Sequence, residues 1–289
     1  MSLHSPRTTP AARGRTGRLD SSPRRRSAEA IAFVAVWMAA GYLLPIDSNG
    51  YLLLGIPLTM VFQLFVRRRP LRELFAPATS TVRWDGRALA MAAALVLLPA
   101  VYAVRAVASQ DWVVAGWYLA AVVGAGCAAF ALRAGTVLGA LRSAALPIAI
   151  GATGFALVYS AMHVVAGVPL SAAAVVAAVV KYTALYFPAS FLLEEVSFRG
   201  AIDPHVHGHE DGGQRGWRSA VFVSVLWGLW HLPVSHGLPL PLQAIELVAV
   251  HVLLGVPLSF AWRRTRNLAG PALAHAVNDA VRNGFMLGL

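Results

Sequence analysis

The sequence predicts an all-α fold, namely a polytopic transmembrane helical bundle of about eight to nine helices. Three observations support this prediction. The 289 residues are 57% hydrophobic and only 13% charged, and the mean hydropathy is +0.62. A soluble globular domain carries roughly twice that share of charged residues. Apolar runs long enough to cross a bilayer also recur from residue 28 onward.

The chain divides into three parts. Residues 1–27 are rich in arginine, proline and serine, and we expect them to form a disordered cytoplasmic tail. Residues 28–169 hold the first membrane helices, of which the first is expected to remain uncleaved. Residues 170–289 form a second group of membrane helices that carries the polar motifs described below. The nine expected spans cover residues 28–45, 51–66, 88–104, 112–132, 146–165, 170–200, 218–236, 242–262 and 271–287.

Arginines are distributed unequally between the two ends of these spans. On one side, only Arg105 lies in a connection between spans. The other side holds Arg67, Arg68, Arg69, Arg72, Arg83, Arg87, Arg133, Arg142, Arg215, Arg218, Arg263, Arg264 and Arg266. Cytoplasmic loops carry an excess of basic residues, so the asymmetry predicts a multi-pass plasma-membrane protein with a cytoplasmic N-terminus.

The net charge of +11 does not indicate nucleic-acid binding. The arginines lie at the ends of apolar segments, and no basic groove with interleaved aromatic residues is present. We therefore expect the lipid bilayer, and no nucleic acid, as a partner. The single cysteine, Cys127, excludes an internal disulfide and a cysteine-based metal site. Lys181 is the only lysine among 24 basic residues, a bias typical of GC-rich bacterial genomes.

Two adjacent carboxylates and a guanidinium follow the apolar stretch 170–193. On a helix, Glu195 and Arg199 are at i and i+4 and can form a supporting ion pair. Glu194 points about 100° away from that pair, so its carboxylate remains available for chemistry. An ionisable residue at membrane depth indicates a functional site by default.

A second polar set lies on the next helix, which holds Trp227 and His231 four residues apart. Glu194 and His231 are nearly equidistant from the turn at residues 212–213. If the two helices form an antiparallel hairpin, the two side chains meet at a similar depth, because each residue adds about 1.5 Å of rise.

A third polar set, His275, Asn278 and Asp279, lies in the last apolar segment. His275 and Asp279 are again at i and i+4. Other histidines are isolated or lie in a loop: His163 and His251 are interpreted as packing residues, and His205, His207 and His209 as part of a flexible, solvated loop.

Two chemistries suit one glutamate and two histidines on separate helices. Glu194 can act as general base on a water while histidine and an amide or acid stabilise the oxyanion. Alternatively, Glu194, His231 and His275 can bind zinc, which activates the water. Spacing alone does not separate the two. A transporter is a further alternative, but the sequence lacks the broken helices in paired halves that it requires.

The three sets resemble the motifs of the CPBP family, the CAAX proteases and bacteriocin-processing enzymes, also called Abi. Glu194-Glu-Val-Ser-Phe-Arg199 resembles its EExxxR motif, and Trp227-Gly-Leu-Trp-His231 resembles FxxxH with tryptophan in place of phenylalanine. His275-Ala-Val-Asn-Asp279 resembles HxxxN or HxxxD. The resemblance covers residues 170–289.

The resemblance implies an intramembrane endopeptidase that hydrolyses a peptide bond of a membrane-associated protein or peptide near the cytosolic membrane face. Glu194 would activate water with help from His231, and His275 and Asp279 would sit at the oxyanion. A carboxylate at 279 would repel an oxyanion unless it is protonated or orients His275, and Asn278 is an alternative donor. We prefer a mechanism without metal or other cofactor over the zinc-dependent one. The rival interpretation is a non-enzymatic scaffold or immunity protein of the same fold.

Overall fold

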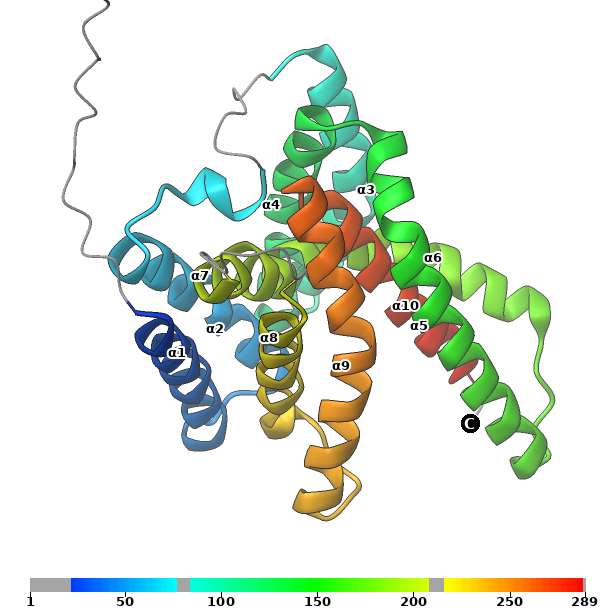
Figure 1. Cartoon of the computed structure of the whole chain (residues 1–289). Helices are drawn as coiled ribbons and strands as arrows, with labels where there is room; N and C mark the ends of the chain where they lie inside the picture. Colours follow the sequence, from blue (N-terminus) through cyan, green and yellow to red (C-terminus); the bar gives the residue numbers. More distant parts are fainter. Residues whose placement is uncertain (1–21, 77–83, 208–215, 288–289) are drawn as a thin grey trace, which may run out of the picture.

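The computed structural model describes residues 22–76, 84–207 and 216–287, and in these ranges all regular structure is helical (Figure 1). The elements are α1 (Pro23–Leu43), α2 (Ser48–Val61), η1 (Phe62–Val66), η2 (Leu71–Leu74), α3 (Gly86–Ala108), α4 (Trp112–Ala134), α5 (Val137–Ala166), α6 (Ala172–Ser190), η3 (Phe191–Ile202), α7 (Asp203–His207), α8 (Trp217–Trp230), η4 (Leu232–Val234), α9 (Leu240–Thr265) and α10 (Ala269–Phe285).

Each of the nine expected spans corresponds to a helix, which confirms the all-α, multi-pass fold class. Within the described ranges, six helical stretches are long and apolar enough to cross a membrane: Ser48–Val66, Gly86–Ala108, Trp112–Ala134, Val137–Ala166, Ala172–His207 and Leu240–Thr265. The three expected spans that do not meet this criterion are those of α1, α8 and α10. At 14 residues, α8 is only about 21 Å long, shorter than a hydrocarbon core of about 30 Å.

Short polar side chains set the starts of most long helices. Asp47, Asp85, Asp111, Thr136 and Ser171 each accept a hydrogen bond from a backbone N–H of the first turn of α2, α3, α4, α5 and α6. Such caps satisfy donors that have no partner inside the helix. The helix boundaries are thus encoded locally in the sequence.

Three boundaries differ clearly from the sequence-based expectation. Helix α5 begins at Val137 instead of residue 146, so Arg142 lies within it. Helix α1 begins at Pro23 instead of residue 28, and the rest of the expected tail lies outside the described residues. The expected loop after residue 202 begins with the helix α7, so His205 and His207 are helical, whereas His209 lies outside the described residues. His205 is buried and contacts Glu29 of α1 at 2.8 Å, which corrects its interpretation as a solvated residue.

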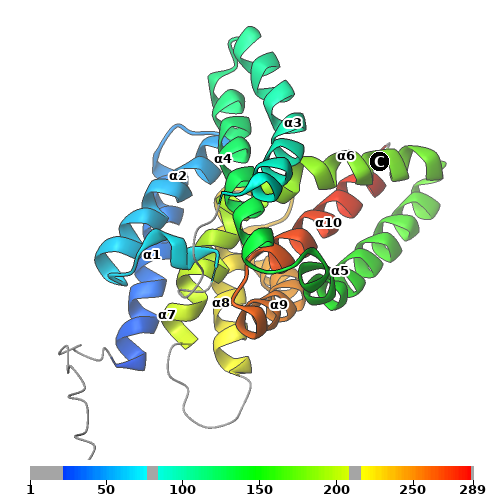
Figure 2. The same cartoon turned by 90° about the horizontal axis from the view of Figure 1, so that it is seen from above.

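The helices pack as adjoining pairs around the second half of the chain. α3 and α4 form a hairpin that projects from the rest, α8 packs along α9, and α10 lies between α5 and α6 (Figure 2). The segment η3 continues α6 into the centre, where it contacts α2, α4 and α10. The polar motifs are therefore brought to the middle of the bundle.

The arginine-rich connections come together at one end of the molecule. Contacts link them in series: Leu268 N–H to Phe75 O, Asn267 Nδ2 to Ala131 O, Arg133 to Asp85, Arg263 to Gly216 O, and Arg67 to Gly200 O. The hydrogen bond from Arg133 lowers the pKa of the Asp85 carboxyl to about 2, so this bridge is charged at neutral pH. The chain thus has one arginine-rich end, as the topology prediction requires.

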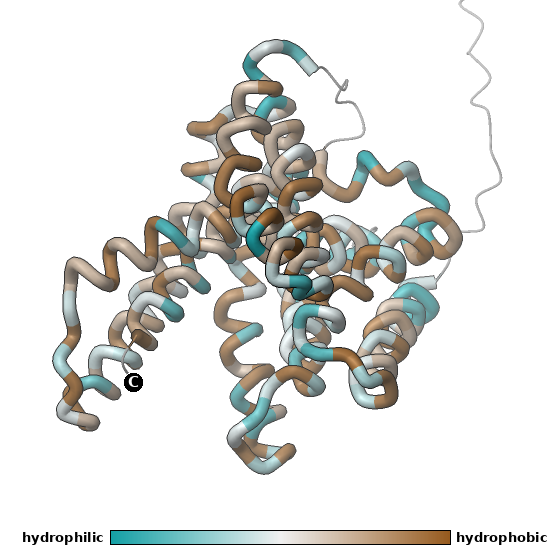
Figure 3. Tube along the Cα trace, turned by 180° about the vertical axis from the view of Figure 1, so that it is seen from behind, coloured by the Kyte–Doolittle hydropathy of each residue, from teal (hydrophilic) through white to brown (hydrophobic). Residues whose placement is uncertain are grey.

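The outer surface of the helices is strongly apolar. Leu43, Val164 and Val165 are each more than 80% exposed, many other large apolar side chains are exposed as well, and hydrophobic residues recur along the helices (Figure 3). Exposed apolar surface of this extent is unusual in a soluble monomer and is expected where helices face lipid. The protein is a multi-pass membrane protein.

Candidate active site

Glu194 lies in η3, where the backbone bonds follow the wider i to i+5 pattern of a π-helix. The change comes just after Pro188, which cannot donate the N–H that a regular α-helix uses. Sequence analysis assumed α-helical geometry here, so the assumed angle of about 100° per residue does not apply strictly. π-helical turns occur frequently at functional sites. In this protein the π-helical stretch contains the whole first motif.

Glu195 and Arg199 form the expected pair, and both side chains are fully buried. Arg199 donates to Glu195 Oε1 at 3.2 Å, and the Nδ1 atom of His275 lies 2.8 Å from the same oxygen. Because a carboxylate oxygen only accepts, His275 Nδ1 carries a proton and donates it. The guanidinium also lies over the Trp227 ring, 4.0 Å from its centroid. The pair therefore contacts the second motif through Trp227 and the third motif through His275.

Glu194 faces residues from both of the other two motifs. The indole N–H of Trp227 donates to Glu194 Oε2 at 3.0 Å. The Nε2 atoms of His231 and His275 lie 3.8 and 3.9 Å from the same oxygen. These two distances are too long for direct hydrogen bonds. The depth prediction for Glu194 and His231 thus holds, and η3, α8 and α10 converge at one carboxylate.

The protonation of His231 follows from its backbone contact. Its Nδ1 atom lies 2.9 Å from the carbonyl oxygen of Trp227. A carbonyl only accepts, so Nδ1 carries the hydrogen and the neutral ring keeps its lone pair on Nε2. That lone pair is on the nitrogen nearest Glu194, which makes His231 a proton acceptor inside the site.

Asp279 contacts His275 and Arg282. Its Oδ2 lies 3.3 Å from His275 Nε2, and its Oδ1 lies 3.4 Å from Arg282. His275 is therefore held at both ring nitrogens by carboxylates. Asn278 is buried, and its side-chain N–H₂ donates to the carbonyl of Pro147 on α5 at 3.3 Å. Asn278 is thus engaged away from Glu194.

His251 of α9 is part of the cluster, although sequence analysis interpreted it as a packing residue. Its ring lies 4.1 Å from the His231 ring and 4.5 Å from the Trp227 ring, and its Nδ1 contacts the carbonyl of Leu247 at 2.6 Å. His251 reaches the cluster because α8 and α9 approach closely at Gly228. A Cβ added at Gly228 would lie only 2.8 Å from the Leu247 oxygen of α9. A single histidine in an apolar run does not indicate from the sequence that two helices will cross beside it.

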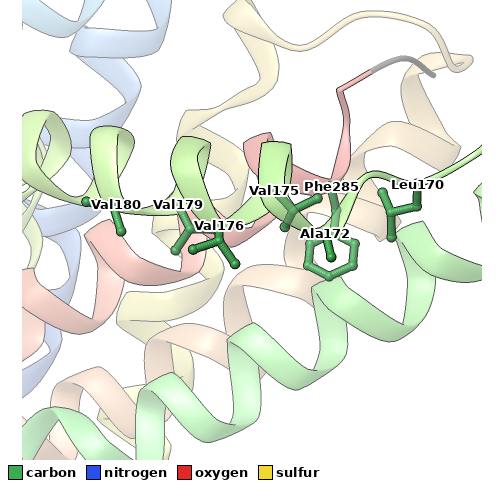
Figure 4. A pocket seen from close by; sticks show the side chains of 7 residues that line it. All are labelled: Leu170, Ala172, Val175, Val176, Val179, Val180 and Phe285. Carbon is green, nitrogen blue, oxygen red and sulfur yellow. The ribbon is translucent and has the colours of Figure 1, made fainter.

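A cavity of about 310 Å³ contains this cluster. Its polar lining residues are Ser48, Asn49, Ser190, Glu194, His231, His251, His275, Asn278, Asp279 and Arg282. A second cavity, of about 400 Å³, lies between the ends of α5, α6 and α10 and is lined only by apolar side chains such as Val176 and Phe285 (Figure 4). Acid–base chemistry requires titratable side chains, so only the first cavity suits it.

A zinc site needs three or four nitrogen, sulfur or carboxylate oxygen donors grouped around one point. Among the described residues, no three His, Cys, Asp or Glu side chains are grouped so that they could hold a metal ion. At Glu194 the indole N–H of Trp227 occupies Oε2, and at His275 both nitrogens face carboxylates. Two of the expected zinc ligands, Glu194 and His275, thus have other hydrogen-bond or ion-pair partners in this structure.

Residues 177–281 match a family model described as type II CAAX prenyl endopeptidase, Rce1-like. The matched stretch contains all three motifs. This segment is similar to the Rce1-like family of CAAX proteases. The similarity indicates a CAAX-type membrane protease, a hydrolase that acts on peptide bonds. A search of curated proteins and a search of solved structures each found no match.

Proposed function

We propose that this Rce1-like protein is an intramembrane endopeptidase in which Glu194 is the general base on the attacking water. The observation that carries the proposal is the convergence of Glu194, His231 and His275, from three helices, in one cavity. A cluster of titratable side chains in a concave site is the expected arrangement for acid–base hydrolysis.

The distances support a role for one water between the three groups. Separations of 3.8 and 3.9 Å from Glu194 Oε2 to the two Nε2 atoms exceed a direct hydrogen bond and suit a bridging water. Glu194 takes a proton from this water as its oxygen attacks the carbonyl carbon, and it returns that proton to the amide nitrogen as the C–N bond breaks and the amine leaves. The Nε2 lone pair of His231 orients the same water by accepting its second hydrogen.

His275 is the proposed electrophilic group. With Glu195 at Nδ1 and Asp279 at Nε2, its ring is fixed and its protonated form is favoured by two carboxylates. Both N–H groups of this ring face carboxylates, so an imidazolium beside the scissile carbonyl would stabilise the oxyanion through its positive charge. In this proposal Asp279 orients His275 and does not face the oxyanion, which removes the repulsion that a carboxylate at this position would otherwise cause.

The arginine-rich end of the molecule supports an orientation in which the N-terminus is cytoplasmic and the protein lies in the plasma membrane. The substrate is then a membrane-associated peptide or protein. The rival function, a non-enzymatic scaffold or immunity protein, predicts that the activity in cells survives substitution of the cluster. Comparing peptide cleavage by the wild type and the Glu194→Gln variant separates the two functions, since only a protease loses its activity through this change.

A further inference from the structure

The cavity around Glu194 is also lined by Tyr186 of α6, which is half-buried. The hydroxyl oxygen of Tyr186 lies 2.8 Å from Nδ2 of Asn283 on α10. Its ring stacks on the ring of Tyr182 with 5.4 Å between the centroids, and it meets the ring of Trp117 edge to face at 6.3 Å. The position of the hydroxyl group is therefore set from three sides.

The two helices that carry this contact also carry part of the catalytic cluster. α6 and its continuation η3 run antiparallel to α10, so that Glu194 faces His275 and Tyr186 faces Asn283 (Figure 2). Tyr186 comes eight residues before Glu194, and Asn283 comes eight residues after His275, so the two pairs share one register. Eight residues of helix rise by about 12 Å, which is the approximate distance between the pairs. The cavity lining between them includes Ser190, Asp279 and Arg282.

The hydrogen bond at Tyr186 has a defined direction. Oδ1 of Asn283 lies 3.3 Å from Nε of Arg282. A guanidinium N–H only donates, so this amide oxygen is the acceptor and the amide N–H₂ faces the tyrosine. The hydroxyl oxygen of Tyr186 accepts from that N–H₂, and its own hydrogen points elsewhere. In the described part of the chain, no protein atom accepts this hydrogen.

A hydroxyl donor at this place in the cavity suits the backbone of a peptide. An extended chain has C=O groups that are not bonded within the chain and that need donors. Such a chain advances by about 3.3–3.6 Å per residue, so the estimated 12 Å from Glu194 corresponds to about three to four residues. A peptide that lies along α6 and α10 with its scissile bond at Glu194 therefore brings a carbonyl group to Tyr186.

We propose that Tyr186 is a substrate-binding residue whose hydroxyl donates a hydrogen bond to a backbone carbonyl about three to four residues from the scissile bond. The inference rests on the proposed peptidase function. Tyr186 does not touch the reacting atoms, so it contributes equally to binding of the ground state and of the transition state. Its loss should therefore raise KM and leave kcat unchanged.

The first test compares Tyr186→Phe with the matched control Tyr182→Phe. Both changes remove one hydroxyl from neighbouring rings of α6, but Tyr182 does not line the cavity. The probe is a palmitoyl-anchored fluorogenic peptide that extends past Tyr186 on both sides of the scissile bond. We expect KM to rise about 2–10-fold for Tyr186→Phe, the value of one neutral hydrogen bond, and to stay unchanged for Tyr182→Phe. An unchanged KM for Tyr186→Phe, while Glu194→Gln is inactive, would refute this inference alone. Full activity of Glu194→Gln would instead refute the proposed function.

The second test reverses the hydrogen bond without removing the hydroxyl. A carboxylate only accepts, so in Asn283→Asp the hydroxyl of Tyr186 donates to residue 283 and its hydrogen no longer reaches the substrate. KM should rise as in Tyr186→Phe, and the double variant should show no further rise. A purely structural contact would survive this change, so a wild-type KM for Asn283→Asp would overturn the proposal. A peptide too short to reach Tyr186 should have the same KM for the wild type and Tyr186→Phe, and a persisting difference would contradict the assigned position.

Discussion

The indole nitrogen of Trp227 lies 3.0 Å from Oε2 of Glu194 and donates a hydrogen bond to it. Tryptophan occupies the position at which the family motif has phenylalanine, a residue that has no donor. The exchange is therefore more than a replacement of one aromatic ring by another. Trp227 also lies under Arg199 and beside His231, His251 and His275, so it fixes the base and its neighbours together.

Trp227→Phe should lower kcat without unfolding the protein. The variant keeps an aromatic ring but removes the donor to Glu194, and hydrogen bonds to charged groups contribute about 1.5–3 kcal/mol. We expect a loss in kcat of roughly tenfold or more, because 1.4 kcal/mol corresponds to a factor of ten. Peptide-cleavage kinetics with a parallel thermal melt measure both quantities. A wild-type kcat would show that this hydrogen bond does not position the base.

Arg199→Ala should destabilise the protein strongly. It leaves Glu195 fully buried without its ionic partner, and breaking a buried pair costs about 3–5 kcal/mol. Arg25→Ala is the matched control, because Arg25 and Glu29 form the same i, i+4 pair with the arginine 68% exposed. An exposed pair contributes only about 0.3–0.5 kcal/mol. Equal melting temperatures of the two variants in detergent would contradict the buried pair.

Gly200→Ala should also destabilise, through a steric clash. The added Cβ would lie 2.2 Å from the backbone oxygen of Leu74, so η2 must move, and overpacking costs about 1–3 kcal/mol. Gly154 of α5 has nothing within 4 Å of an added Cβ. Gly154→Ala should therefore raise the melting temperature slightly, since alanine is favoured over glycine in a helix by about 0.5–1 kcal/mol. Stabilisation by both changes would argue against the close approach at Gly200.

Much of this architecture could be predicted from the sequence, because the responsible signals are local. Apolar length gives the helices, and capping residues such as Asp85 and Thr136 mark their starts. The convergence of Glu194 and His231 was predictable because two helices joined by one turn place equidistant residues at equal depth. The i, i+4 relation likewise predicted the contact between His275 and Asp279.

The remaining features depend on how helices cross, which spacing does not encode. His251 joins the site because α8 and α9 touch at Gly228, and nothing around His251 in the sequence distinguishes it from His163. The π-helical form of η3 and the helix α7 after it were not predicted, because a regular α-helix was assumed up to residue 200 and a loop after it.

The proposal of a metal-free mechanism predicts that the purified protein hydrolyses peptide with less than stoichiometric zinc, and that dialysis against a chelator leaves kcat unchanged. The physical reason is that Glu194 and His231 supply the proton acceptors, so no Lewis acid is needed to activate the water. Metal analysis of the same preparation used for kinetics checks this. Stoichiometric zinc whose removal stops cleavage would require the alternative mechanism instead.

The central claim is that Glu194 is the base, and Glu194→Gln tests it most directly. Glutamine keeps the size and the acceptor for Trp227 but cannot take a proton from water. The matched control is Glu246→Gln, which changes an exposed glutamate of α9 in the same way.

The measurement is kcat for peptide cleavage by the wild type and the two variants at equal thermal stability. We predict a loss of about 10²–10⁴-fold for Glu194→Gln and none for Glu246→Gln, because general-base catalysis contributes an effect of this size. His231→Ala or His275→Ala added to Glu194→Gln should cause little further loss, since groups that act as a unit are not additive. Wild-type cleavage by a folded Glu194→Gln protein would contradict the account.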